Sequence, residues 1–73
     1  MEKIKELLKG YGYEEEEFYQ EGNKFRFVKD NSFVDIWFGK KGTTIGIYNP
    51  ADKTMNFKRK VDILEIERII SNL

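Results

Sequence analysis

The hydrophobic residues follow two different spacings along the chain. Near both ends, apolar residues recur every three or four positions, which is the spacing of one face of a helix. This pattern predicts helices over residues 2–9 and 63–72. Between them, apolar and polar residues alternate in short runs divided by turn residues, as in the strands of an antiparallel sheet. The pattern therefore predicts five strands between two helices.

Local signals mark where the two helices begin and end. Gly10 is predicted to end the first helix in a left-handed conformation. Asp62 and Glu65 form a capping-box pattern at the start of the second helix, with Val61 and Ile66 spaced as a hydrophobic staple. The apolar stripe of this helix is Ile63, Ile66, Ile69, Ile70 and Leu73.

Four turns set the register of the predicted sheet. They are Gly22-Asn23, Asp30-Asn31, Gly39–Gly42 and Asn49–Lys53. Because a slip of one residue would turn a strand inside out, the turn lengths can be tested against the hydrophobic pattern. A uniform register collects the apolar strand residues on one face, namely Phe25, Phe27, Val34, Ile36, Ile45, Ile47 and Phe57. We expect this face to be the core.

The same register fixes the predicted fold. It places Phe18 opposite Phe27 in the first hairpin and Ile45 opposite Phe57 in the last. Both amphipathic helices need an apolar surface, and only the core face offers one. The prediction is an α+β fold in the order α-β-β-β-β-β-α, a five-stranded antiparallel meander with both helices on one face. A coiled sheet that closes toward a small barrel is the alternative. With 73 residues, the chain is expected to form a single compact domain over 1–73.

The opposite sheet face is predicted to collect aromatic side chains that neither helix covers. They are Trp37, Phe33, Tyr48 and Tyr19, and Arg26 lies among them opposite Asp35. Antiparallel sheets often leave one face in water, and cross-strand aromatic pairs stabilise such a face by roughly 0.2–1 kcal/mol. Four aromatic residues together nevertheless indicate a contact surface, because exposed apolar patches usually mark one. Trp, Tyr and Arg are also the residue types that dominate binding hot spots.

The charges balance in number but not in predicted position. Thirteen acidic and thirteen basic residues give a net charge of zero, which weighs against a general nucleic-acid binder. Alternate turns of a meander lie at the same end of the sheet. The end beside Trp37 therefore gathers Lys24, Lys40, Lys41, Lys58, Arg59 and Lys60, whereas Glu14–Glu17, Asp30 and Asp52 tend toward the other end. The predicted partner-binding residues are the four aromatic residues with Arg26, Lys24, Lys40, Lys41, Lys58 and Arg59.

The residue types that most often carry catalysis are missing or isolated. The chain has no histidine and no cysteine, so the usual general base, thiol nucleophile and soft metal ligand are absent. Ser32 and Ser71 have no evident base, and no pair of carboxylates is singled out by its spacing. A strand would divide the side chains of Glu14–Glu17 between two faces, which disfavours a metal site. We expect no catalytic residues, no cofactor and no metal ion.

Composition and patterning together predict a small cytoplasmic protein-binding module. The absence of cysteine gives no sign of an oxidising compartment, and no long apolar stretch suggests a signal peptide or a membrane partner. The expected role is that of an inhibitor or adaptor. By size and composition alone, it fits the phage and other mobile-element products that block host enzymes, including anti-defence proteins. The alternatives are single-stranded nucleic-acid binding on the same face and a homodimer through that face, so the chain is expected to be a monomer or homodimer.

Overall fold

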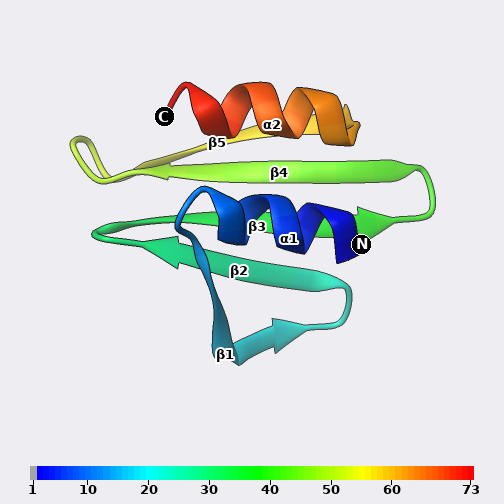
Figure 1. Cartoon of the computed structure of the whole chain (residues 1–73), viewed down its shortest axis with the longest axis horizontal. Coiled ribbons are helices and arrows are strands. Elements are labelled where there is room, and N and C mark those ends of the chain that lie inside the picture. Colours follow the sequence, from blue (N-terminus) through cyan, green and yellow to red (C-terminus); the bar gives the residue numbers. More distant parts are fainter. Residues whose placement is uncertain (1) are drawn as a thin grey trace.

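The computed structural model describes the backbone of residues 2–73 and the side chains of residues 2–16 and 22–73. The order of helices and strands is the predicted one (Figure 1). The elements are α1 (Glu2–Gly10), β1 (Glu14–Glu21), β2 (Lys24–Lys29), β3 (Ser32–Gly39), β4 (Gly42–Asn49), β5 (Thr54–Val61) and α2 (Ile63–Ser71).

The five strands form one antiparallel meander. Their order in the sheet, β1-β2-β3-β4-β5, is their order in the chain. Figure 1 shows both helices on the same side of the sheet. In the part of the chain that the structure describes, the sheet is not closed, so the predicted meander is confirmed and the barrel alternative is not needed. Neither described helix has the length and apolar character needed to cross a membrane.

The core lies between the helices and the sheet face that they cover. Its buried hydrophobic residues are Ile4, Leu8, Tyr13, Phe25, Phe27, Val34, Ile36, Ile45, Val61, Ile66 and Ile70. Ile47 is half-buried and packs against this cluster. The predicted two-residue turns are confirmed, since Lys29 pairs with Ser32 and Gly39 with Gly42. Five of the seven predicted core residues are thus buried and a sixth is partly buried.

The end of α1 differs from the sequence prediction. Gly10 is part of the helix, and the left-handed residue is Gly12, with φ 92°. The Tyr13 N–H donates to the Leu8 carbonyl at 3.0 Å, and the Gly12 N–H donates to the Lys9 carbonyl at 3.0 Å. These two bonds form a Schellman motif, whose left-handed position favours glycine because a Cβ is strained there. The motif turns the chain so that Tyr13 enters the core.

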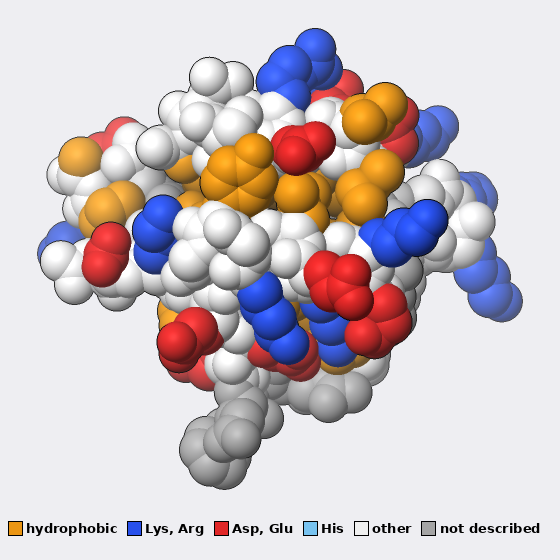
Figure 2. Space-filling view, viewed as in Figure 1, with side chains coloured by type: hydrophobic (Ala, Val, Ile, Leu, Met, Phe, Trp, Pro, Cys, Tyr) orange, Lys and Arg blue, Asp and Glu red, His pale blue; other side chains and the backbone are white. Residues whose placement is uncertain are grey.

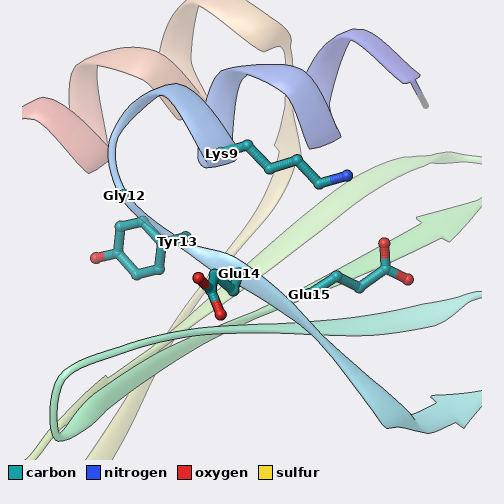
Figure 3. Close-up of a pocket in the computed structure, with 5 residues that line it drawn as sticks. All are labelled: Lys9, Gly12, Tyr13, Glu14 and Glu15. Carbon is teal, nitrogen blue, oxygen red and sulfur yellow. The ribbon is translucent and has the colours of Figure 1, made fainter.

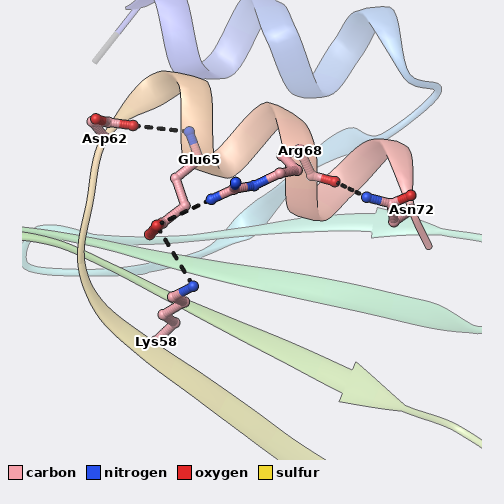
Figure 4. A network of polar contacts seen from close by, with 5 residues as sticks. All are labelled: Lys58, Asp62, Glu65, Arg68 and Asn72. Atoms are coloured by element: carbon pink, nitrogen blue, oxygen red, sulfur yellow. Dashed lines mark hydrogen bonds and ion pairs between the residues drawn. The ribbon is translucent and has the colours of Figure 1, made fainter.

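Asp62 caps the start of α2 as predicted, but the Glu65 side chain pairs with Lys58 and Arg68 in place of completing the predicted capping box. Asp62 accepts a hydrogen bond from the Glu65 N–H at 2.8 Å. The Glu65 carboxylate lies 3.5 Å from Lys58 Nζ and 3.4 Å from an Arg68 guanidinium nitrogen (Figure 4). Because Lys58 reaches α2, its side chain lies on the helix-covered side of β5.

The predicted register of β5 is wrong by one residue. Asn49 pairs with Thr54, because the β4–β5 turn holds four residues and places Lys53 in a left-handed conformation with φ 58°. Gly46, and not Ile45, is therefore opposite Phe57. Phe57 was predicted to be buried, but it points away from the helices and is 59% exposed.

A β-bulge restores the alternation before β5 ends. Ile45 pairs with Lys58, but Thr43 pairs with Val61, so β5 contains one extra residue between these pairs. Lys60 has a left-handed φ of 55° at this point. The extra residue returns Val61 to the core side, where it is 5% exposed.

The predicted register of β1 is also wrong. Glu21 pairs with Lys24 as predicted, but Glu15 is the partner of Phe27, so Phe18 does not lie opposite Phe27. The ladder shifts between Glu15 and Gln20. The side chain of Tyr19 lies outside the described residues, so its place on the open sheet surface stays a prediction.

Candidate functional site on the open sheet face

The sheet surface opposite the helices carries a cluster of aromatic and charged side chains, which we call the open face. Its members in β2–β5 are Lys24, Arg26, Phe33, Asp35, Trp37, Tyr48, Met55 and Phe57. The register places Lys24 beside Trp37 and Arg26 beside Asp35. Gly46 follows on β4, opposite Asp35 on one side and Phe57 on the other.

A buried carboxylate lies at the centre of the open face. Asp35 is only 2% exposed, although it lies on the side without helices. It accepts hydrogen bonds from Arg26 Nε at 2.8 Å and from a second Arg26 nitrogen at 3.0 Å, and Lys24 Nζ lies 3.7 Å away. Bidentate, charge-assisted bonds of this kind offset the penalty of burying the carboxylate. Asp35 thereby fixes two cations on the open face.

The aromatic rings of β3 contact these cations of β2 and also contact other rings, Tyr48 on β4 and Phe57 on β5. The Arg26 guanidinium lies 3.9 Å from the centre of the Phe33 ring. Phe33 in turn stacks on Tyr48, with ring centres 4.7 Å apart and planes 7° apart. In the same way, Trp37 lies between Lys24, at 4.8 Å from its ring centre, and Phe57, at 5.6 Å. Phe33 is therefore flanked by Arg26 and by a stacked ring, whereas the contact of Trp37 with Phe57 is tilted by 55°.

Phe57 lies across a glycine. A Cβ at position 46 would stand 2.8 Å from Phe57 Cε1 and 3.1 Å from Met55 Cε, so both side chains would have to shift to make room for it. Because Gly46 has no side chain, the Phe57 ring can pack over its backbone and contact Trp37. Phe57 stays 59% exposed in this position, so the structure holds a large aromatic side chain at the surface.

The predicted basic residues do not all lie together. Lys40 and Lys41 are exposed in the β3–β4 turn, and Arg59 is exposed one residue after the helix-facing Lys58. Figure 2 shows basic side chains at the right-hand end of the molecule, where Figure 1 places this turn. Lys58 was predicted to stand beside Trp37, but it pairs with Glu65 on the other side of the sheet (Figure 4). The corrected basic rim of the open face is Lys24, Lys40, Lys41 and Arg59.

Sequence reasoning missed Phe57 and Met55 as members of the open face, because it counted three residues in the β4–β5 turn. Two side-chain bonds make the turn longer. Asn49 Oδ1 accepts from the Ala51 N–H at 3.0 Å, and Asp52 Oδ1 accepts from the Thr54 N–H at 3.2 Å. An Asx residue that bonds two positions ahead is a known turn former, so this pair was the available signal.

The described carboxylates Glu14 and Glu15, at the start of β1, do not converge on one point. Figure 3 shows the carboxylates of Glu14 and Glu15 pointing in different directions beside the hollow that they line with Lys9 and Tyr13. Glu15 pairs with Lys5 at 3.4 Å. Among the described residues, no group of three acidic side chains could hold a metal ion.

Apolar side chains are also exposed on the helix side. Figure 2 shows them at the surface in the band between the two helices. On α2, Leu64 is 74% exposed, as expected from its place outside the apolar stripe, and Ile63 is 37% exposed. For these residues the structure gives no ring contact or ion pair that would hold them in position. They provide a comparison for the ordered aromatic residues of the open face.

The open face presents aromatic surface and paired charges. No pair of groups described there is placed to activate a nucleophile.

Comparison with known proteins found no match to any protein-family model, any curated protein or any solved structure.

Proposed function

We propose that the chain is a non-catalytic protein-binding module, an inhibitor or adaptor that uses the open face. The observation that carries this proposal is Phe57, which is 59% exposed and yet packs over Gly46 and against Trp37. A side chain that keeps the same contacts in the free and the bound protein loses little conformational entropy on binding. Large aromatic residues in such positions are the usual anchors of protein interfaces.

The arrangement of the rings supports a protein partner over single-stranded nucleic acid. Base stacking needs an aromatic ring with a free face. Phe33 lies between Arg26 and Tyr48, and Trp37 lies between Lys24 and Phe57. Phe33 therefore offers a partner mainly its edge, which suits the irregular packing of side chains in a protein interface better than it suits a stacked base.

The charges around the rings support a partner that carries carboxylates. Lys40, Lys41 and Arg59 are exposed. Among the described residues of the open face in β2–β5, the acidic residue is Asp35, which is buried and paired. In a symmetric dimer through this face, like charges would come close together, which costs free energy. An acidic target is also compatible with a mobile-element inhibitor of a host enzyme, anti-defence proteins included, and we include that role in the proposal.

The test is affinity capture from cells of the source organism with three immobilised proteins. They are the wild type, Phe57→Ala and the control Leu64→Ala, which removes an exposed side chain from the helix side. We expect Phe57→Ala to weaken binding of the captured protein by about 2 kcal/mol or more, roughly thirtyfold, and Leu64→Ala to leave it unchanged. Retention by Phe57→Ala together with loss in Leu64→Ala would assign the interface to the helix side and overturn the proposal.

A second measurement separates the other uses of the open face. The molecular mass in solution is measured with and without a single-stranded oligonucleotide. A monomer that ignores the oligonucleotide agrees with protein binding. A complex with the oligonucleotide that Trp37→Ala abolishes would show nucleic-acid binding instead. A dimer that Phe57→Ala dissociates would show self-association.

A further inference from the structure

A cleft lies at the end of the molecule away from Lys40 and Lys41. The turns β2–β3 and β4–β5, the connection from α1 to β1 and the last turn of α2 all meet there (Figure 1). Its volume is about 710 Å³. Small-molecule sites usually measure about 300–1,000 Å³, so the cleft has the size of a ligand site.

The wall of the cleft is mostly apolar and partly rigid. Ile70 and Tyr13 belong to the hydrophobic core, being 4% and 6% exposed. Tyr11 and Ile47 are half-buried, and Leu73, which is 61% exposed, stands at the rim. A flat apolar group could replace water against these residues and gain the free energy of apolar burial.

Polar groups without internal partners also line the cleft. Within the described residues, the Tyr13 hydroxyl and the side-chain amides of Asn31 and Asn56 have no hydrogen-bond partner. No fully buried polar atom lacks a partner, so the Tyr13 hydroxyl must reach solvent although its residue is almost buried. Figure 3 shows this hydroxyl pointing away from Glu14 and Glu15. A few such donors and acceptors in an apolar recess are what fix a ligand's orientation.

The charges of the cleft favour an uncharged ligand. Its charged lining side chains are Lys29 and Asp30, which balance each other. The Lys29 ammonium donates to the Tyr11 carbonyl at 2.8 Å and lies 5.5 Å from the Tyr13 ring centre. Burial and the charge of Asp30 raise the pKa of the Tyr13 hydroxyl, which keeps it a neutral donor at neutral pH.

We propose that this cleft binds a small uncharged molecule with a flat apolar ring and hydrogen-bonding groups on its edge, the chemistry of a nucleoside. The ring packs between Tyr11, Ile47 and Leu73. The Tyr13 hydroxyl donates to the ligand, and the Asn56 amide both donates and accepts. Tyr48 lines both the cleft and the open face. The residues proposed to hold the ligand belong to the cleft alone, so this proposal does not rest on the protein partner proposed for the open face.

The test is an NMR titration of the isotope-labelled chain with adenosine as the probe. We expect saturable chemical-shift changes in residues that line the cleft. Tyr13→Phe keeps the buried ring, removes the hydroxyl and should weaken binding about three- to tenfold, the effect of one lost hydrogen bond. Asn56→Ala should act similarly. Leu64→Ala, at the far end of α2, is the matched control and should bind as the wild type does.

Two further probes test the chemical class. Glucose is uncharged but has no flat apolar ring, and adenosine monophosphate adds a charged group. We expect glucose to bind at least tenfold more weakly than adenosine, and the phosphate to give no gain. Three outcomes would overturn the proposal: no saturable shifts with adenosine, shifts that lie outside the cleft, and undiminished binding by both Tyr13→Phe and Asn56→Ala. Tighter binding of the monophosphate would also overturn the assignment to an uncharged ligand.

Discussion

Replacing Phe57 with alanine tests the register of β5 directly. The side chain is 59% exposed, so about two-fifths of its surface is buried. Full burial of a phenylalanine stabilises a protein by roughly 1.5–3 kcal/mol, so the buried part contributes about 1 kcal/mol. The contact with Trp37 adds roughly 0.5–1 kcal/mol, because aromatic pairs contribute beyond their buried area. Phe57→Ala should therefore lower the free energy of unfolding by about 1–2 kcal/mol.

The loss in the free energy of unfolding for Phe57→Ala is compared with that for Ile45→Ala. Ile45 is 0% exposed and lies on the core side of the adjacent strand. Its truncation leaves a cavity and should cost roughly 2–5 kcal/mol. Both variants are measured by urea unfolding, followed by far-UV circular dichroism and by Trp37 fluorescence. The emission of folded Phe57→Ala should shift to the red, because Trp37 gains water on the side that Phe57 covered.

A core phenylalanine would behave differently. In the register predicted from the sequence, Phe57 would face Ile45, and Phe57→Ala would cost roughly 3–5 kcal/mol. A loss of that size, or a Phe57 variant less stable than the Ile45 variant, would refute the four-residue turn. Phe57 would then lie in the core, and the open face would lose its anchor.

Three further substitutions test other parts of the structure. Asp35→Asn should lower the free energy of unfolding by about 1.5–3 kcal/mol in urea titrations, because it removes the charge that faces Arg26. Asp62→Asn is the control and should be nearly neutral, because asparagine also caps helices. Gly12→Ala should cost about 1 kcal/mol or more because of its left-handed φ, whereas Gly10→Ala should be neutral or stabilising in thermal melts. Burial and the charge of Asp30 raise the pKa of the Tyr13 hydroxyl in the folded protein. As the pH rises above about 10, the unfolded chain therefore loses the hydroxyl proton before the folded protein does, and the free energy of unfolding falls. Urea titrations at increasing pH should show this fall in the wild type and a smaller fall in Tyr13→Phe.

The central strands could be predicted because two kinds of information agree there. The two-residue turns at Asp30-Asn31 and Lys40-Lys41 fix the register of β2, β3 and β4. The alternation of Val34 and Ile36 with polar neighbours fixes which side is buried. A slip in either turn would have moved these residues into water, so only one register satisfies both constraints.

The outer strands β1 and β5 have too few apolar residues for the hydrophobic pattern to fix their register. In β5, the only apolar residues before Val61 are Met55 and Phe57, which share one side of the strand. Either side could have been the core, so the turn length alone decides. The glutamate run of β1 has no apolar residue to position it at all. The end of α1 was wrong for a related reason, since Gly10 and Gly12 are both able to follow a helix, and the core packing of Tyr13 selects the second.

The candidate site could be predicted in part. Trp37, Phe33 and Tyr48 lie on the open face because they belong to the well-determined strands β3 and β4. Phe57 was assigned to the core and Lys58 to the open face, and both errors follow from the single slip in β5. The burial of Asp35 was not visible in the sequence. It depends on how the side chains of Arg26 and Lys24 converge on Asp35 in three dimensions.

The long turn and the bulge of β5 act as a pair of compensating insertions. The extra residue in the turn exchanges the sides of the sheet that successive side chains of β5 face, and the extra residue near Lys60 reverses this exchange before Val61. Only the side chains of Thr54–Arg59 therefore face the side opposite to the predicted one. If Asn49 paired with Met55 in place of Thr54, Phe57 would point inward and Lys58 outward, and the bulge before Val61 would not be needed. The register of this one strand therefore decides which side chains this edge of the protein shows to other molecules.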